Sequence, residues 1–159
     1  MITVSNTTPI ISLSSINKLF ILKELFGEIF ISQAVYDEIK AKKSYGYDDV
    51  DFDFIRVQPI KGIIYRDLLL HQLDLGEAET IILAKEINAD YVIIDENTAY
   101  KIAKNSNLDV IRTLSILLKA KQNGIISEIK PLLDEMLVKG RWYSRNVYEN
   151  FLRRAEELK

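Results

Sequence analysis

Short apolar runs alternate with helical patterns along the chain, and this alternation restricts the fold more than any other feature. Five runs have the β-branched, breaker-bounded character of strands, at 2–5, 28–32, 54–58, 90–95 and 108–112. Helical patterns lie between and after them, at 9–25, 32–43, 64–72, 76–88, 97–106, 114–123, 127–139 and 145–158. Strands that alternate with helices form a parallel sheet covered on both faces, so the sequence predicts an α/β fold.

The composition excludes several kinds of chemistry. The 159 residues contain no cysteine and one histidine, His71, which rules out disulfides, thiolate sites and two-histidine acid–base pairs. The absence of cysteine suits a reducing cytoplasm. No apolar run approaches the ~20 residues of a membrane span, and no basic segment precedes the first apolar one, so we expect neither a span nor a signal peptide. The net charge of −2 leaves nucleic acid only a local basic patch to bind.

The length predicts one domain over 1–159, with a core at about 1–123 and a helical extension at about 124–159. Within the core, residues 44–53 are acidic and aromatic and contain a glycine, which is typical of a loop or lid. This loop and the last helix are the surfaces that we expect to contact another chain.

Polar residues follow the predicted strands at the edge where ligands of parallel sheets bind. The first strand leads to Asn6, the fourth to Asp95, and the fifth to Arg112 and Thr113. The helix after the second strand carries Glu38, and the helix before the fourth strand begins near Glu77. We therefore expect three carboxylates from three segments to meet at this edge.

Such a cluster needs a cation, because like charges packed together are costly. Oxygen ligands without histidine or cysteine select hard cations, above all Mg²⁺ or Mn²⁺. Each acid also has a structural interpretation. Asp95 could cap the next helix, Asp74 and Glu77 match a capping box, and Glu38 could be a solvated helix residue. Thr8, ahead of a proline, is typical of a helix N-cap.

Aromatic and basic residues near the C-terminal end offer a second kind of site. Trp142 and Tyr143 follow Arg141 and could stack on nucleic-acid bases, although packing at the edge of the core is the favoured interpretation. Lys101, Lys104 and Arg141 are candidates for phosphate contacts.

Five short motifs, taken together, resemble the PIN-domain family, and in particular its small prokaryotic VapC-like branch. They are S-N-T-T-P, V-Y-D-E-I, L-G-E-A-E, I-I-D-E-N and V-I-R-T-L, within a likeness that runs from residue 3 to about 137. The resemblance implies a three-layer α/β/α sandwich around a five-stranded parallel sheet. It also implies a metal-dependent ribonuclease, often the toxin of a type II toxin–antitoxin pair.

The resemblance assigns the family's acidic positions to Asn6, Glu38, Glu77 and Asp95, and its polar position to Thr113. These residues are the candidate catalytic residues, and the first four are the candidate metal ligands. Asn6 stands where nucleases of this fold usually carry aspartate, so it offers an oxygen without a charge. A second departure is Arg112, where a small residue is commoner. It could reach a substrate phosphate, or pair with Glu77 or Asp95 and close the site.

The implied reaction is hydrolysis of RNA phosphodiesters by a metal-activated water, on single-stranded or structured RNA. The implied partners are RNA, an antitoxin protein and a second copy of the chain. The alternative is a catalytically weak or inactive PIN-fold protein that binds RNA or an antitoxin without cleavage. A phosphotransfer receiver and an aspartyl phosphatase fit poorly, because an acidic pair or Asp-x-Asp is missing after the first strand.

Overall fold

A five-stranded parallel sheet forms the centre of the molecule, with its strands in the order β3-β2-β1-β4-β5. The computed structural model describes residues 1–159. The strands are β1 (Thr3–Ser5), β2 (Ile29–Ser32), β3 (Ile55–Gln58), β4 (Tyr91–Ile93) and β5 (Val110–Ile111). The chain builds outward from β1 to β3, then returns to the other side of β1 to add β4 and β5. The carboxyl ends of β1 and β4 therefore flank the point at which strand order reverses, where ligands of open α/β sheets bind.

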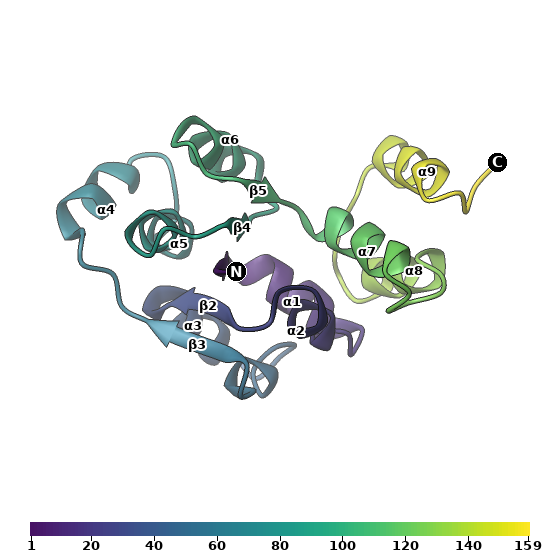
Figure 1. The fold of residues 1–159 in the computed structure, drawn as a ribbon, viewed down its shortest axis with the longest axis horizontal. Helices are drawn as coiled ribbons and strands as arrows, with labels where there is room; N and C mark the ends of the chain where they lie inside the picture. Colours follow the sequence, from purple (N-terminus) through teal and green to yellow (C-terminus); the bar gives the residue numbers. More distant parts are fainter.

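Helices cover both faces of the sheet, so the predicted three-layer α/β/α sandwich is confirmed (Figure 1). Helices α5 and α6 lie on one face, and α1, α2 and α7 lie on the other. The helices are α1 (Thr7–Ser15), α2 (Phe20–Phe26), α3 (Gln33–Lys40), α4 (Ile63–Leu69), α5 (Leu75–Glu86), α6 (Asn97–Asn105), α7 (Thr113–Gln122), α8 (Lys130–Val138) and α9 (Arg145–Arg154). No helix combines the length and the apolar character that crossing a bilayer requires.

Alternate residues of β2, β4 and β5 pack into two separate hydrophobic clusters, one on each face of the sheet. Val4 and Val92 pack with α5 and α6, whereas Ile31 and Ile93 pack with the helices of the other face. Burial on both faces explains why the central strand β4 is a continuous apolar run. Residues of α8 and α9, such as Leu133, belong to the larger cluster, so the C-terminal helices share the core of the sheet.

The polar residues at the edge of the sheet lie at the starts of helices, and the N-cap residues of two helices differ from the prediction. The residue before α1 is Asn6, not Thr8, and its side chain makes no capping hydrogen bond. Pro9 stands in the first turn, where its missing N–H needs no partner. The cap of α6 is Glu96, whose carboxylate accepts the N–H of Ala99, so Asp95 is not the cap. The side chains of Asn6 and Asp95 therefore do not cap the helices that follow them, α1 and α6.

The remaining local features follow the sequence patterns. The predicted break between the first two helices falls at Asn17, which has a φ of 55°. The predicted capping box of Asp74 and Glu77 is present at the start of α5. The predicted loop at 44–53 includes a short 3₁₀ turn, Asp49–Asp51, and buries Val50 in the larger hydrophobic cluster.

Candidate active site

Oxygen atoms of Asn6 and Glu38 lie around Gly76, although the three residues come from different segments. A Cβ at Gly76 would lie 2.8 Å from Oε2 of Glu38 and 3.6 Å from Oδ1 of Asn6. Thr7 donates its hydroxyl to the same oxygen of Glu38 at 2.7 Å. The Thr80 hydroxyl donates to the main-chain oxygen of Gly76 at 2.7 Å and lies 3.4 Å from Oδ1 of Asn6. The absence of a side chain at Gly76 therefore lets the carboxylate of Glu38 approach the helix backbone closely, with the amide oxygen of Asn6 nearby.

The carboxylate of Asp95 is oriented by the first residue of α7. The N–H of Thr113 donates to Oδ1 of Asp95 at 2.8 Å, and the Thr113 hydroxyl donates to Oδ2 at 2.7 Å. Both residues are buried, and the start of a helix favours a negative charge. Because β4 and β5 are paired in parallel, these two residues meet at the strand ends although they lie 18 positions apart.

Glu77 is buried next to other carboxylates. Its carboxylate accepts the N–H of Asp74 at 3.0 Å and closes the capping box. Burial raises the pKa of Glu77 above its ordinary value, and the charges of Asp74, Glu96 and Glu38 raise it further. Glu77 therefore lies close enough to several other acids for their negative charges to repel its own.

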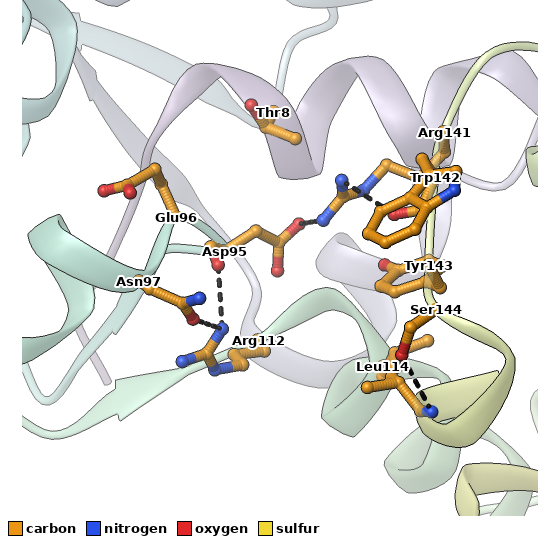
Figure 2. A pocket seen from close by; sticks show the side chains of 11 residues that line it. Thr8, Asp95, Glu96, Asn97, Arg112, Leu114, Arg141, Trp142, Tyr143 and Ser144 are labelled. Atoms are coloured by element: carbon orange, nitrogen blue, oxygen red, sulfur yellow. Dashed lines mark hydrogen bonds and ion pairs between the residues drawn. The ribbon is translucent and has the colours of Figure 1, made fainter.

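Arginine side chains approach Asp95 from two sides (Figure 2). Arg112 does not pair with the carboxylate of Glu77 or of Asp95. It donates instead to the main-chain oxygen of Asp95 at 2.8 Å and to Oδ1 of Asn97 at 3.0 Å. Its guanidinium also lies 4.1 Å from the ring centre of Tyr100. The carboxylate of Asp95 instead pairs with Arg141, whose Nη2 lies 3.5 Å from Oδ2. The segment between α8 and α9 thus supplies the cation at this acid.

A family model described as a PIN domain matches residues 2–157, nearly the whole chain. The chain belongs to the PIN-domain family. No curated protein matches the chain significantly. Domains of this family are generally nucleases, and they typically use divalent metal ions.

The oxygens of this PIN domain suit a hard divalent cation in their chemistry. The possible ligands are carboxylate and amide oxygens, without histidine or cysteine, and two of them lie beside Gly76. The structure corrects the expectation that three carboxylates meet: no group of three acidic side chains is placed to hold a metal ion. Glu38, Glu77 and Asp95 each accept hydrogen bonds from other residues of the protein instead. A bound ion would compete with these protein donors for the carboxylate oxygens.

The five predicted residues of the PIN domain are all at the carboxyl edge of the sheet. Asn6 and Glu38 meet at Gly76, Glu77 is the next residue along α5, and Thr113 holds Asp95. Their catalytic and metal-binding roles stay predictions.

Sequence reasoning missed the residues that support this set, namely Thr7, Gly76 and Thr80, and it missed the pairing of Arg141 with Asp95. The sequence could have indicated Gly76, because alanine is a better helix former than glycine and a glycine in the first turn of a helix therefore suggests a close contact there.

Proposed function

We propose that this PIN domain is a divalent-metal-dependent endoribonuclease that hydrolyses phosphodiesters of single-stranded or structured RNA. The observation that carries the proposal is the meeting of Asn6 and Glu38 around the bare backbone of Gly76, at the edge that also holds Glu77 and Asp95. Carboxylates placed near one another repel, so such an arrangement is in keeping with a site that a cation would neutralise.

In this proposal Asn6, Glu38, Glu77 and Asp95 hold Mg²⁺ or Mn²⁺, and Thr113 is a positioning residue that fixes the carboxylate of Asp95. The ion, when bound, polarises the scissile phosphate and activates a water molecule. The chain needs no nucleophile of its own, in keeping with the lack of cysteine and with a single histidine that lies exposed on the surface.

We further propose that the domain is the cytoplasmic toxin of a type II toxin–antitoxin pair, and that it binds an antitoxin protein and a second copy of itself. The support is an apolar surface on α4, where Ile64, Tyr65 and Leu68 are largely exposed. Exposed apolar side chains that gather on one helix are typical of a protein-binding surface.

The test is a cleavage assay on labelled single-stranded RNA with Mn²⁺, Mg²⁺ or EDTA. Wild type should cleave with either metal and not with EDTA, and Asp95→Asn should abolish cleavage. The matched control is Asp109→Asn, which removes an exposed carboxylate at the other edge of the sheet. Cleavage that survives Asp95→Asn would contradict the site, and an inactive wild type with both metals would contradict the nuclease proposal.

A second candidate function is RNA or antitoxin binding without cleavage. Two observations favour it: Asn6 brings no charge, and Arg141 already pairs with Asp95. An inactive wild type that still binds labelled RNA or a partner protein would support this candidate.

A further inference from the structure

A cavity of about 760 Å³ lies beside Asp95 and extends to the segment that joins α8 to α9. Arg112 borders it from the end of β5, and Arg141 and Trp142 border it from the joining segment (Figure 2). A second cavity, next to Glu38, shares Thr8 and Arg141 with the first. Arg141 therefore borders both cavities, the one beside Asp95 and the one beside Glu38.

Trp142 lines this cavity, and its side chain does not pack into the core. The residue is 74% exposed, although the favoured interpretation of the sequence placed it at the edge of the core. That interpretation was wrong for Trp142 and right for its neighbour Tyr143, which packs against the larger hydrophobic cluster. A large aromatic ring left in solvent at the rim of a cavity is a platform on which a base can stack.

Arg141 has hydrogen-bonding capacity to spare. Its Nε is buried without a partner, and its contacts with Asp95 and with the main-chain oxygen of Trp142 are both 3.5 Å long. A guanidinium has five N–H donors, and buried donors are normally satisfied. The ring of Tyr143 fixes the guanidinium at 4.5 Å, so Arg141 is oriented but underused. A phosphate group is a suitable ligand for a guanidinium, because it can accept two parallel N–H hydrogen bonds.

Arg112 adds a second positive charge to the same cavity, and its position is fixed by Asn97, Tyr100 and the main chain of Asp95. An aromatic platform with two fixed guanidiniums, beside a carboxylate of the candidate site, matches one nucleotide with its phosphate.

We propose that this cavity is a nucleotide subsite of single-stranded RNA, in which a base stacks on Trp142 and the adjoining phosphate binds Arg141. This inference rests on the proposed function and deepens it. RNA binding draws Arg141 from Asp95 to the phosphate, which frees an oxygen of that carboxylate. The subsite selects unpaired nucleotides, because a base inside a duplex cannot present its face to the indole.

The test uses the fact that Trp142 is the only tryptophan of the chain. A short single-stranded RNA, titrated in EDTA and again in Ca²⁺, should quench the tryptophan fluorescence in a saturable manner, and the same RNA in a duplex should not. Absence of saturable quenching in both buffers would overturn the proposal. Quenching by an acidic peptide but not by RNA would assign the cavity to a protein ligand and would also overturn it.

Variants separate the two contacts when affinity is measured by anisotropy of labelled RNA. Trp142→Ala should weaken binding by roughly 5- to 150-fold, and Trp142→Phe should restore most of it. Phe20→Ala removes another exposed aromatic side chain, at the start of α2, and should change nothing. Arg141→Ala should lower the slope of log affinity against log salt by about 0.7, the value for one phosphate contact on a single strand. Trp142→Ala should leave that slope unchanged.

The two proposals fail in different ways. Unchanged affinity in Trp142→Ala, with metal-dependent cleavage intact, would overturn the subsite alone. Tight binding that depends on Trp142, in a protein that never cleaves, would overturn the nuclease and support the subsite. Circular dichroism of each variant excludes loss of the fold as the cause.

Discussion

Replacing Gly76 with alanine tests whether the oxygens around it form a working site, because the new methyl group would enter the space between them. The alanine Cβ would lie 2.8 Å from Oε2 of Glu38, whereas ordinary contacts begin at 3.4 Å. The carboxylate must therefore retreat by roughly 0.6 Å, the difference between these distances. Glu38 is exposed and this oxygen is the end of a flexible side chain, so the retreat requires no backbone shift.

We expect Gly76→Ala to lose activity while keeping its stability. Misplacing a reacting group by about 1 Å can cost ~100-fold in rate, so a displacement of about 0.6 Å predicts a loss of roughly tenfold or more. The helix should gain about 0.5–1 kcal/mol from the exchange of glycine for alanine. The weakened hydrogen bond from Thr7 to Glu38 costs about 1 kcal/mol. These effects nearly cancel, so the free energy of unfolding should change by less than about 1 kcal/mol.

The measurements are RNA cleavage with Mn²⁺ and urea unfolding, both on wild type and Gly76→Ala. The control is the same substitution in a Glu38→Asp background, where the shorter side chain leaves room for the methyl group. There Gly76→Ala should have little further effect, as a double-mutant cycle would report. Full activity in Gly76→Ala, or a stability loss above about 2 kcal/mol, would refute the reasoning from this contact.

Two other substitutions test the charges of the same site. Asn6→Asp supplies the missing charge, so calorimetry should show Mn²⁺ binding about tenfold to a thousandfold tighter. The control, Asn105→Asp at the end of α6, should leave the affinity for Mn²⁺ unchanged. No gain for Asn6→Asp would mean that Asn6 does not face the ion. Glu77→Gln keeps the acceptor for the N–H of Asp74 but removes the ionisable group. Burial raises the pKa of Glu77 above 4.5, so its carboxyl binds a proton more tightly in the folded state than in the unfolded chain. The protonated carboxyl therefore stabilises the fold below the unfolded pKa, and this stabilisation is lost as pH rises through the raised pKa. Urea unfolding across this range should show wild type losing stability relative to Glu77→Gln as pH increases, and a difference that is constant with pH would contradict the raised pKa.

The strands and the order of the layers could be predicted from the sequence, because each depends on a local pattern. Runs such as Val92, Ile93 and Ile94 have a composition that only burial on both faces favours, and both faces of the sheet are in fact covered. The capping box at Asp74 also depends only on residues three apart. Boundaries were less well predicted, since β5 is two residues long where five were expected.

Pairings between distant residues could not be predicted, because they depend on where loops return. The sequence indicated that Arg112 was near the acids, yet the backbone turns it toward the main chain of Asp95 and Asn97. Arg141, 46 positions beyond Asp95 by residue number, reaches its carboxylate only because α8 packs back against α1. The same packing left Trp142 in solvent and Tyr143 in the core, which adjacent residues of similar character do not reveal.

The amino-acid sequence by itself determined the alternation of strands and helices, and with it the edge at which Asn6, Asp95 and Thr113 emerge, since strand ends follow directly from burial patterns. Only the tertiary structure decided that the bare backbone of Gly76 lies against the oxygens of Glu38 and Asn6, and that an arginine from the segment between α8 and α9 pairs with Asp95. The reason is physical: hydrophobic burial is set residue by residue along the chain, whereas hydrogen bonds and ion pairs need two groups placed within about 3–4 Å, and that distance is fixed by the packing of the whole domain.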